Sequence, residues 1–159
     1  MKLTREKVLE LNHVLAHTNF EMPISARFRY TVSQNIKIAK DEIDAINEAF
    51  KMPEEFNAYN NERQQIINAA GISSDEEYLK MEEEARKELD GKLKELDEKY
   101  AEVLNKVNAI NAERAEFLKD EIELPLKTVK LDDMPDISET NEYPHWQIWA
   151  VLETIVVED

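Results

Sequence analysis

The chain has 159 residues, with 35 Asp or Glu against 20 Lys or Arg, so its formal net charge is −15. This charge repels a phosphate backbone and disfavours direct binding to nucleic acid. The absence of cysteine excludes disulfides, thiolate zinc sites and cysteine nucleophiles. Two glycines are few for a β-rich fold or a phosphate-cradling loop. The apolar fraction of 42% still allows a core.

The first 50 residues predict two helices. Thr4 is a candidate N-cap for a helix from Leu3 to about His17, which the Met22-Pro23 pair terminates. A second helix is expected from near Ser25, with apolar residues in steps of four and three, as in one helix lying along another. Those residues are Val32, Ile36, Ala39, Ile43, Ile46 and Phe50. Pro53 interrupts the pattern, and either kinks this helix or begins a new one.

A short turn separates these residues from a third helix. Gly71 fits a helix C-cap, and Ser74 with Glu77 fits a capping box that opens the next helix. Helices joined by so short a turn fold back antiparallel. The third helix is expected from about Ser74 to about Leu118. Its seam is Leu89, Leu93, Leu96, Tyr100, Val103, Val107, Ile110 and Phe117. At 1.5 Å per residue each arm would extend roughly 65–70 Å.

The end of the chain has a different pattern. Residues Glu121–Leu131 nearly alternate between apolar and polar, and Pro125 makes them an extended, edge-like segment. The last segment, Tyr143–Val157, would be apolar nearly all round as a helix, so it must be buried.

The expected fold is therefore mainly α, in one domain covering residues 1–159. A long, coiled-coil-like antiparallel helical hairpin projects from a small base, which the N-terminal helix and the C-terminal segment form. Residues 1–50 and 101–159 make the base and proximal hairpin, and residues 51–100 make the distal hairpin. The N-terminus reads as an amphipathic helix rather than a signal peptide, and no apolar run is long enough to cross a bilayer. We expect a cytoplasmic protein with no membrane partner.

Three histidines are the only candidate metal ligands of nitrogen type. His13 and His17 are four residues apart on one helix, close enough to share a metal ion, and His145 could be a third ligand. No Glu occupies the metalloprotease position, so packing or surface roles are expected. No Ser–His–Asp arrangement, phosphate loop or dinucleotide fingerprint is visible. We expect no catalysis, no metal and no cofactor.

Two groups of residues are candidates for binding a partner protein. The first is an acidic stretch on the third helix, formed by Glu82, Glu83, Glu84, Glu88 and Asp90. Lysines and arginines interleave with it, which is typical of a solvated face with i, i+4 ion pairs. The second is Trp146 with Trp149, which share a helix face as binding residues or as core. Separately, Arg27, Phe28, Arg29 and Tyr30 form either a small recognition patch or a helix start with buried aromatics and paired arginines.

Four stretches carry a resemblance to a known family. They are MKLTREKVLELNHVLAH, ISARFRYTVSQNIKIAKDEIDAINEAF, PLKTVKLDDMPD and IWAVLETIVVED. Their layout resembles a family of small, acidic, helical bacteriophage and prophage proteins of unknown function. Its members have two N-terminal helices, a variable charged middle and an acidic C-terminus. The resemblance implies an origin in a phage or prophage genome, with no functional residues to carry over.

These features favour a phage-encoded protein that binds a host or phage protein in the host cytoplasm. One version is an inhibitor of a host defence system, similar to an anti-CRISPR protein, that occupies a basic nucleic-acid-binding surface of its target. The alternative is a virion structural or assembly protein that forms homo-oligomers through the hairpin. A third reading is a metal-dependent enzyme using His13, His17 and carboxylates.

Overall fold

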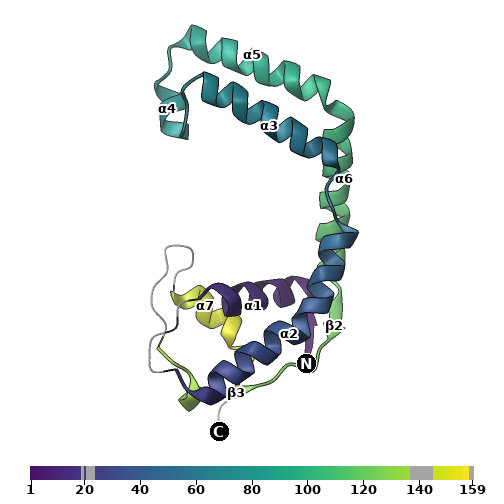
Figure 1. Ribbon diagram of the computed structural model, residues 1–159, viewed down its shortest axis with the longest axis vertical. Coiled ribbons are helices and arrows are strands. Elements are labelled where there is room, and N and C mark those ends of the chain that lie inside the picture. The colour runs from purple at the N-terminus through teal and green to yellow at the C-terminus, as the bar shows by residue number, and fades with distance from the viewer. Residues whose placement is uncertain (19, 21–23, 137–144, 158–159) are drawn as a thin grey trace. The chain divides into compact units, whose positions relative to one another are not determined.

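The computed structural model describes residues 1–18, 20, 24–136 and 145–157 (Figure 1). The described part is mainly α, as the sequence predicts, with seven α-helices and two sheets of two short strands each. By their contacts the residues fall into two compact units, 1–49 with 115–159 and 50–114. The expectation of a single domain stays a prediction.

The first unit contains α1 (Arg5–His17), α2 (Ala26–Ala49) and α7 (His145–Leu152), and α1 packs against both other helices. Thr4 caps α1 as predicted: its side chain accepts a hydrogen bond from the Lys7 backbone N–H at 3.3 Å. Since apolar residues recur at helical spacing on α1, one face of it enters the core. That core contains Val8, Leu11, Val14, Leu15, Ala39, Ile148, Leu152 and Ile155.

Two short sheets tie the chain ends into this unit. Strand β1 (Lys2–Thr4) pairs antiparallel with β2 (Glu121–Glu123), placing Leu3 opposite Ile122. Strand β3 (Val129–Lys130) pairs parallel with β4 (Val156–Val157), and a 3-10 turn follows β3 at Leu131–Asp133. Residues 121–131 are thus largely extended around Pro125, as predicted. The last segment is helical only as far as Leu152, where α7 ends, and the short strand β4 follows it.

An arginine and an asparagine bind distant parts of the first unit together. Arg5 lies over the Phe117 ring, 4.0 Å from its centroid, and its Nε donates to Glu42 at 2.6 Å. Asn35 on α2 is 1% exposed. Its side-chain amide donates to the Lys127 carbonyl at 2.9 Å, and its oxygen accepts from the Lys127 N–H at 2.7 Å. These two hydrogen bonds satisfy the backbone N–H and carbonyl of Lys127, whose segment has no strand partner among the described residues.

The second unit contains α3 (Glu54–Ala69), α4 (Asp75–Lys80) and α5 (Glu83–Lys99), followed by α6 (Ala101–Phe117). Helices α3 and α5 lie side by side (Figure 1), and Tyr59, Leu89 and Leu96 are buried in this unit. Pro53 begins a new helix as the N-cap of α3, which settles the choice left open by the sequence. Gly71 has φ 73° just after α3, the left-handed conformation that a glycine C-cap supplies.

The single long hairpin expected from the sequence is not what the contacts show. Helix packing occurs instead as α1 with α2 and as α3 with α5. The predicted helix from Ser74 to Leu118 consists of three helices, broken at Met81–Glu82 and at Tyr100. Tyr100 has φ −105° and ψ 18°, outside the helical range, and the backbone turns between α5 and α6 there (Figure 1). Seam periodicity survives such a bend, so the sequence pattern alone does not reveal it.

Candidate protein-binding surface

The short helix α4 and its two flanking turns form one end of the second unit. Ser74 caps α4, and its side chain accepts from the Glu77 N–H at 3.3 Å, as predicted. The Glu77 carboxylate accepts from the N–H and hydroxyl of Ser73, at 2.6 and 2.7 Å. In a standard capping box the glutamate side chain accepts from the N–H of the capping residue, which here is Ser74. Glu77 accepts instead from the N–H of Ser73, one residue earlier. These Ser73 hydrogen bonds hold the pKa of Glu77 below its ordinary value.

Two α5 side chains hold α4 in place. The Arg86 guanidinium donates to the carbonyls of Leu79 and Met81, at 3.0 and 3.1 Å. Leu79 belongs to the last turn of α4 and Met81 is its C-cap residue. Carbonyls at this end of a helix lack intrahelical partners, so the Arg86 guanidinium caps the C-terminal end of α4. Asp90 accepts a hydrogen bond from the Tyr78 hydroxyl at 2.9 Å. The backbone at Met81 is extended, with φ −63° and ψ 149°, and the Arg86 hydrogen bonds accompany this break between α4 and α5.

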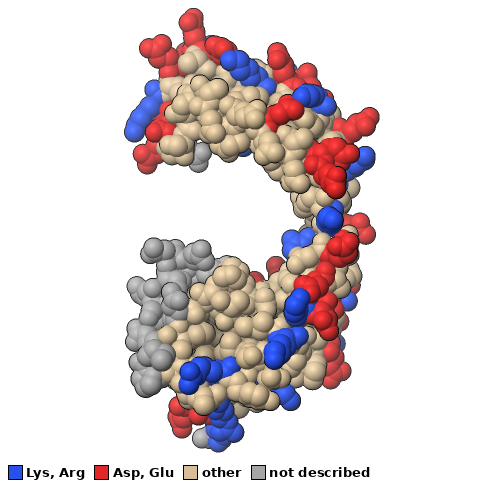
Figure 2. Space-filling model, viewed as in Figure 1, with Lys and Arg blue, Asp and Glu red and all other residues tan. Residues whose placement is uncertain are grey.

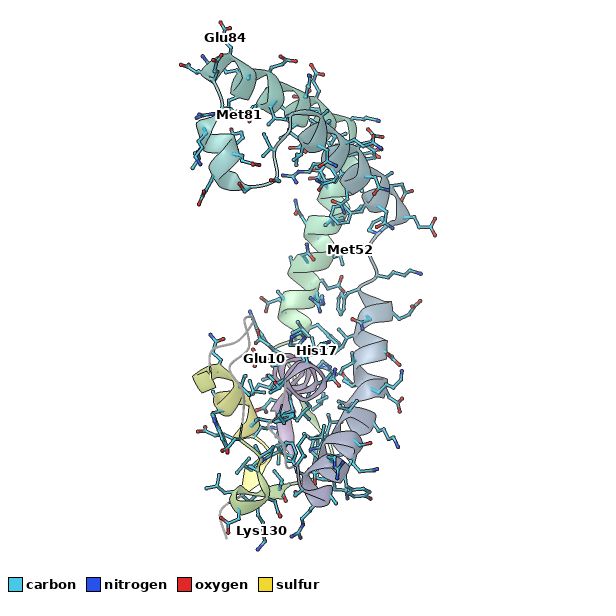
Figure 3. The ribbon with its side chains drawn as sticks, turned by 60° about the vertical axis from the view of Figure 1, so that its left-hand side comes forward. Glu10, His17, Met52, Met81, Glu84 and Lys130 are labelled. Atoms are coloured by element: carbon cyan, nitrogen blue, oxygen red, sulfur yellow. The ribbon has the colours of Figure 1, made fainter. Side chains whose placement is uncertain are left out.

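The predicted acidic stretch divides into paired and unpaired carboxylates. Glu83 binds Lys87 and Glu88 binds Lys92, each at 2.6 Å and i, i+4, as a solvated helix face predicts. Red and blue side chains accordingly alternate along α5 in Figure 2. Asp90 is engaged by Tyr78. Glu82 and Glu84 are exposed and make no ion pair with a described residue, and Figure 3 shows Glu84 at the start of α5 with its carboxylate directed outward.

Leu79 is an apolar residue that the sequence analysis did not single out. It is 67% exposed on α4, more than any other large apolar side chain among the described residues. Its position two heptads before Leu93 places it in register with the helical seam, so periodicity predicts burial. The break at Met81–Glu82 removes it from that seam. We call Leu79, Glu82 and Glu84 the docking tip.

Contacts between α3 and α5 fix the helices that carry the docking tip. The Tyr59 hydroxyl donates to Asp97 at 2.8 Å, and the Tyr59 ring meets the Tyr100 ring edge-on. Glu62 accepts from the Lys99 ammonium at 2.6 Å and from the Tyr100 hydroxyl at 2.8 Å. The Lys99 and Tyr100 hydrogen bonds hold the pKa of Glu62 below its ordinary value of 4.5.

Replacing Glu62 by glutamine should make the stability difference from wild type depend on pH. A lowered folded-state pKa contributes stability above the unfolded value, and that contribution disappears as the pH falls through the folded value. The wild type should therefore be the more stable protein at pH 7. The difference should shrink as the pH falls below the ordinary value of 4.5 and vanish below the lowered folded-state pKa. Urea unfolding followed by circular dichroism measures this. Glu84→Gln is the matched control, and a Glu62→Gln difference that persists in acid would contradict the assignment.

No relative was found for this protein. Comparison with family models, curated proteins and solved structures gives no match. The resemblance to phage proteins therefore stays a prediction. None of the helices in the described part of the chain is long and apolar enough to cross a membrane.

The remaining predicted site residues lie in the first unit. His13 and His17 stack with ring centroids 4.4 Å apart, and His17 Nδ1 lies 2.9 Å from the His13 carbonyl oxygen, where it can donate. Among the described residues, no three His, Asp or Glu side chains are grouped to hold a metal ion. The side chain of His145 lies outside the described part.

The remaining candidates are the tryptophan pair on α7 and the four residues 27–30 at the start of α2. Trp149 is half buried against the first unit's core, as the core interpretation of the pair expects, and the Trp146 side chain lies outside the described part. Phe28 is buried, and Arg27 pairs with Asp133 at 3.3 Å. Tyr30 is 63% exposed. Arg29 makes no ion pair with a described residue. The helix-start interpretation thus holds for Phe28 and Arg27 but not for Arg29 or Tyr30.

Proposed function

We propose that this protein acts without catalysis, by binding a basic surface of a partner protein through the docking tip. The observation that carries the proposal is the exposed side chain of Leu79, close in sequence to carboxylates without partners among the described residues. Protein interfaces commonly combine an apolar anchor with charged side chains. The acidic sign requires a basic partner.

The bracing of α4 supports this assignment. A surface fixed before binding loses less conformational entropy when the partner arrives. Arg86 and Asp90 restrict the backbone and side chains around Leu79 through the hydrogen bonds already described. Glu83 and Glu88 have lysine partners on their own helix, so binding through them would first require those pairs to break. Glu82 and Glu84 carry no such cost.

The specific version is an inhibitor encoded by a phage, acting in the host cytoplasm. Its target would be a host defence protein whose basic nucleic-acid channel the docking tip enters. The small size, the net charge of −15 and the resemblance to phage proteins support it.

Reversing the two unpaired charges should weaken the complex. The variant Glu82→Lys/Glu84→Lys is expected to bind its target about tenfold more weakly at low salt, with the difference shrinking at high salt through screening. Leu79→Ala should weaken binding at both salt concentrations, because it removes apolar contact. The matched control is Glu102→Lys/Glu113→Lys, which makes the same charge change at exposed α6 residues.

The experiment is affinity capture from bacteria that express candidate defence systems, followed by titration of the captured protein. A DNA or RNA oligonucleotide should displace the captured target from this protein. The target should also bind the tip variant more weakly than the control variant. Capture that both variants share, or that the oligonucleotide leaves intact, would overturn the proposal. So would a dimer of this protein that blocks capture and forms through the same tip.

A further inference from the structure

The first half of α2 borders an open apolar groove of about 350 Å³. Phe28, Val32 and Ile36 form a row along one side of it, each four residues after the last. Leu15 of α1 and Phe20 line it as well, and the Phe20 ring meets the Phe28 ring edge-on at 4.9 Å between centroids. Two helical turns separate the ends of the row, which makes it roughly 12 Å long.

A second row runs beside the apolar row on the same helix. Arg29, Ser33 and Lys37 are all exposed, and all border the groove. Neither Arg29 nor Lys37 makes an ion pair with a described residue. Two neighbouring cations behave differently, since Arg27 pairs with Asp133 and Lys40 with Asp44. The groove therefore has a cationic rim with a hydroxyl between its two charges.

This rim stands out against the charge of the whole protein. Residues 24–40 contain four Lys or Arg and no Asp or Glu, in a protein with a net charge of −15. Lys and Arg side chains lie over this part of α2 in Figure 2. Because salt screens charges beyond about 8 Å under physiological conditions, a ligand in the groove experiences this rim more strongly than distant acids. The ligand should therefore be apolar on one side and anionic beside it.

We propose that this groove binds an acidic amphipathic helix of a partner protein. The ligand's apolar residues, spaced i, i+4 and i+7 or i+8, would pack on the half-buried side chains of Val32 and Ile36. The buried Phe28 ring supports this surface from below. Glutamates or aspartates beside them would pair with Arg29 and Lys37. A single-headgroup amphiphile has one anionic group and would use one of the two cations. An open groove also encloses a small molecule less than a typical ligand pocket does. Helix-in-groove binding uses both rows.

This surface is independent of the docking tip, because it lies in the first unit and selects the opposite charge. The probe is a fluorescein-labelled helical peptide of about 16 residues, with leucines spaced i, i+4 and i+8 and glutamates beside them. Its partner peptide has lysines in place of the glutamates. Fluorescence anisotropy with the full-length protein should show tighter binding of the glutamate peptide, by about tenfold at low salt.

The variant Arg29→Glu/Lys37→Glu should reverse this preference, weakening the glutamate peptide and strengthening the lysine peptide. The matched control is Lys7→Glu/Lys127→Glu, which makes the same charge change at exposed first-unit residues outside the groove. It should keep the wild-type preference, and circular dichroism should show both variants folded. Because the control variant has the same net charge, a gain of lysine-peptide binding in the groove variant alone separates recognition from non-specific charge attraction.

Three outcomes would overturn the proposal. The first is equal affinity of wild type for the two peptides. The second is an identical preference in the groove variant and the control variant. The third is binding of dodecanoate or of anionic phospholipid vesicles, lost in the groove variant, by a protein that does not bind the glutamate peptide; this would make the groove an amphiphile site.

Discussion

Replacing Leu152 by alanine should destabilise the first unit by about 2–5 kcal/mol, the range for a leucine removed from a well-packed core. Leu152 is 0% exposed in a cluster that also contains Leu11 and Ile155. The free energy of unfolding of a small protein is about 5–15 kcal/mol, so this one change removes a large part of it. Both tryptophans, Trp146 and Trp149, belong to α7, so tryptophan fluorescence during urea unfolding reports on this unit.

Leu79→Ala is the matched control. Because Leu79 lies in the second unit, the urea unfolding of this variant is followed by circular dichroism rather than by tryptophan fluorescence. This substitution removes the same atoms from a side chain that is 67% exposed, so the expected loss of stability is less than about 0.5 kcal/mol. A comparable loss in both variants would show that Leu79 is buried in solution, which would also remove the docking tip. The same substitution, leucine to alanine, thus tests the fold at Leu152 and the exposure on which the proposed function depends at Leu79.

Asn35→Ala should destabilise the protein by about 2–4 kcal/mol. The change removes two hydrogen bonds to Lys127 and leaves the N–H and carbonyl of a part-buried backbone segment without their partner. Asn35→Asp should be no better, because a carboxylate accepts from the Lys127 N–H but cannot donate to its carbonyl. Urea unfolding at pH 7 measures both variants against wild type.

Asn47→Ala provides the comparison on the same helix. Asn47 is exposed, and alanine has the higher helix propensity, so stability should stay the same or rise slightly. If Asn35→Ala were equally harmless, the Lys127 segment would not depend on α2 for its position. Its hydrogen bonds would then have to be satisfied by solvent.

The sequence by itself determined the features that depend on neighbouring residues. The cap at Thr4, the left-handed Gly71 and the cap at Ser74 follow from local backbone chemistry, and all three are present. Helical spacing of apolar residues predicted the mainly α fold. The solvated pairs of the acidic stretch were equally local, since i, i+4 neighbours share a helix face whatever the rest of the protein does.

The tertiary structure alone decided the helix breaks and the candidate sites. Arg86 of α5 donates to the carbonyls of Leu79 and Met81 at the end of α4, and the sequence analysis, which expected one helix from Ser74, did not single out the exposed Leu79. The α2 rows can be read from spacing, but the groove exists only because Leu15 and Phe20 lie beside them. Asn35 meets Lys127 across 92 residues of sequence. Local patterns fix what each segment prefers, whereas contacts between distant residues select where a helix stops and which side chains stay in water.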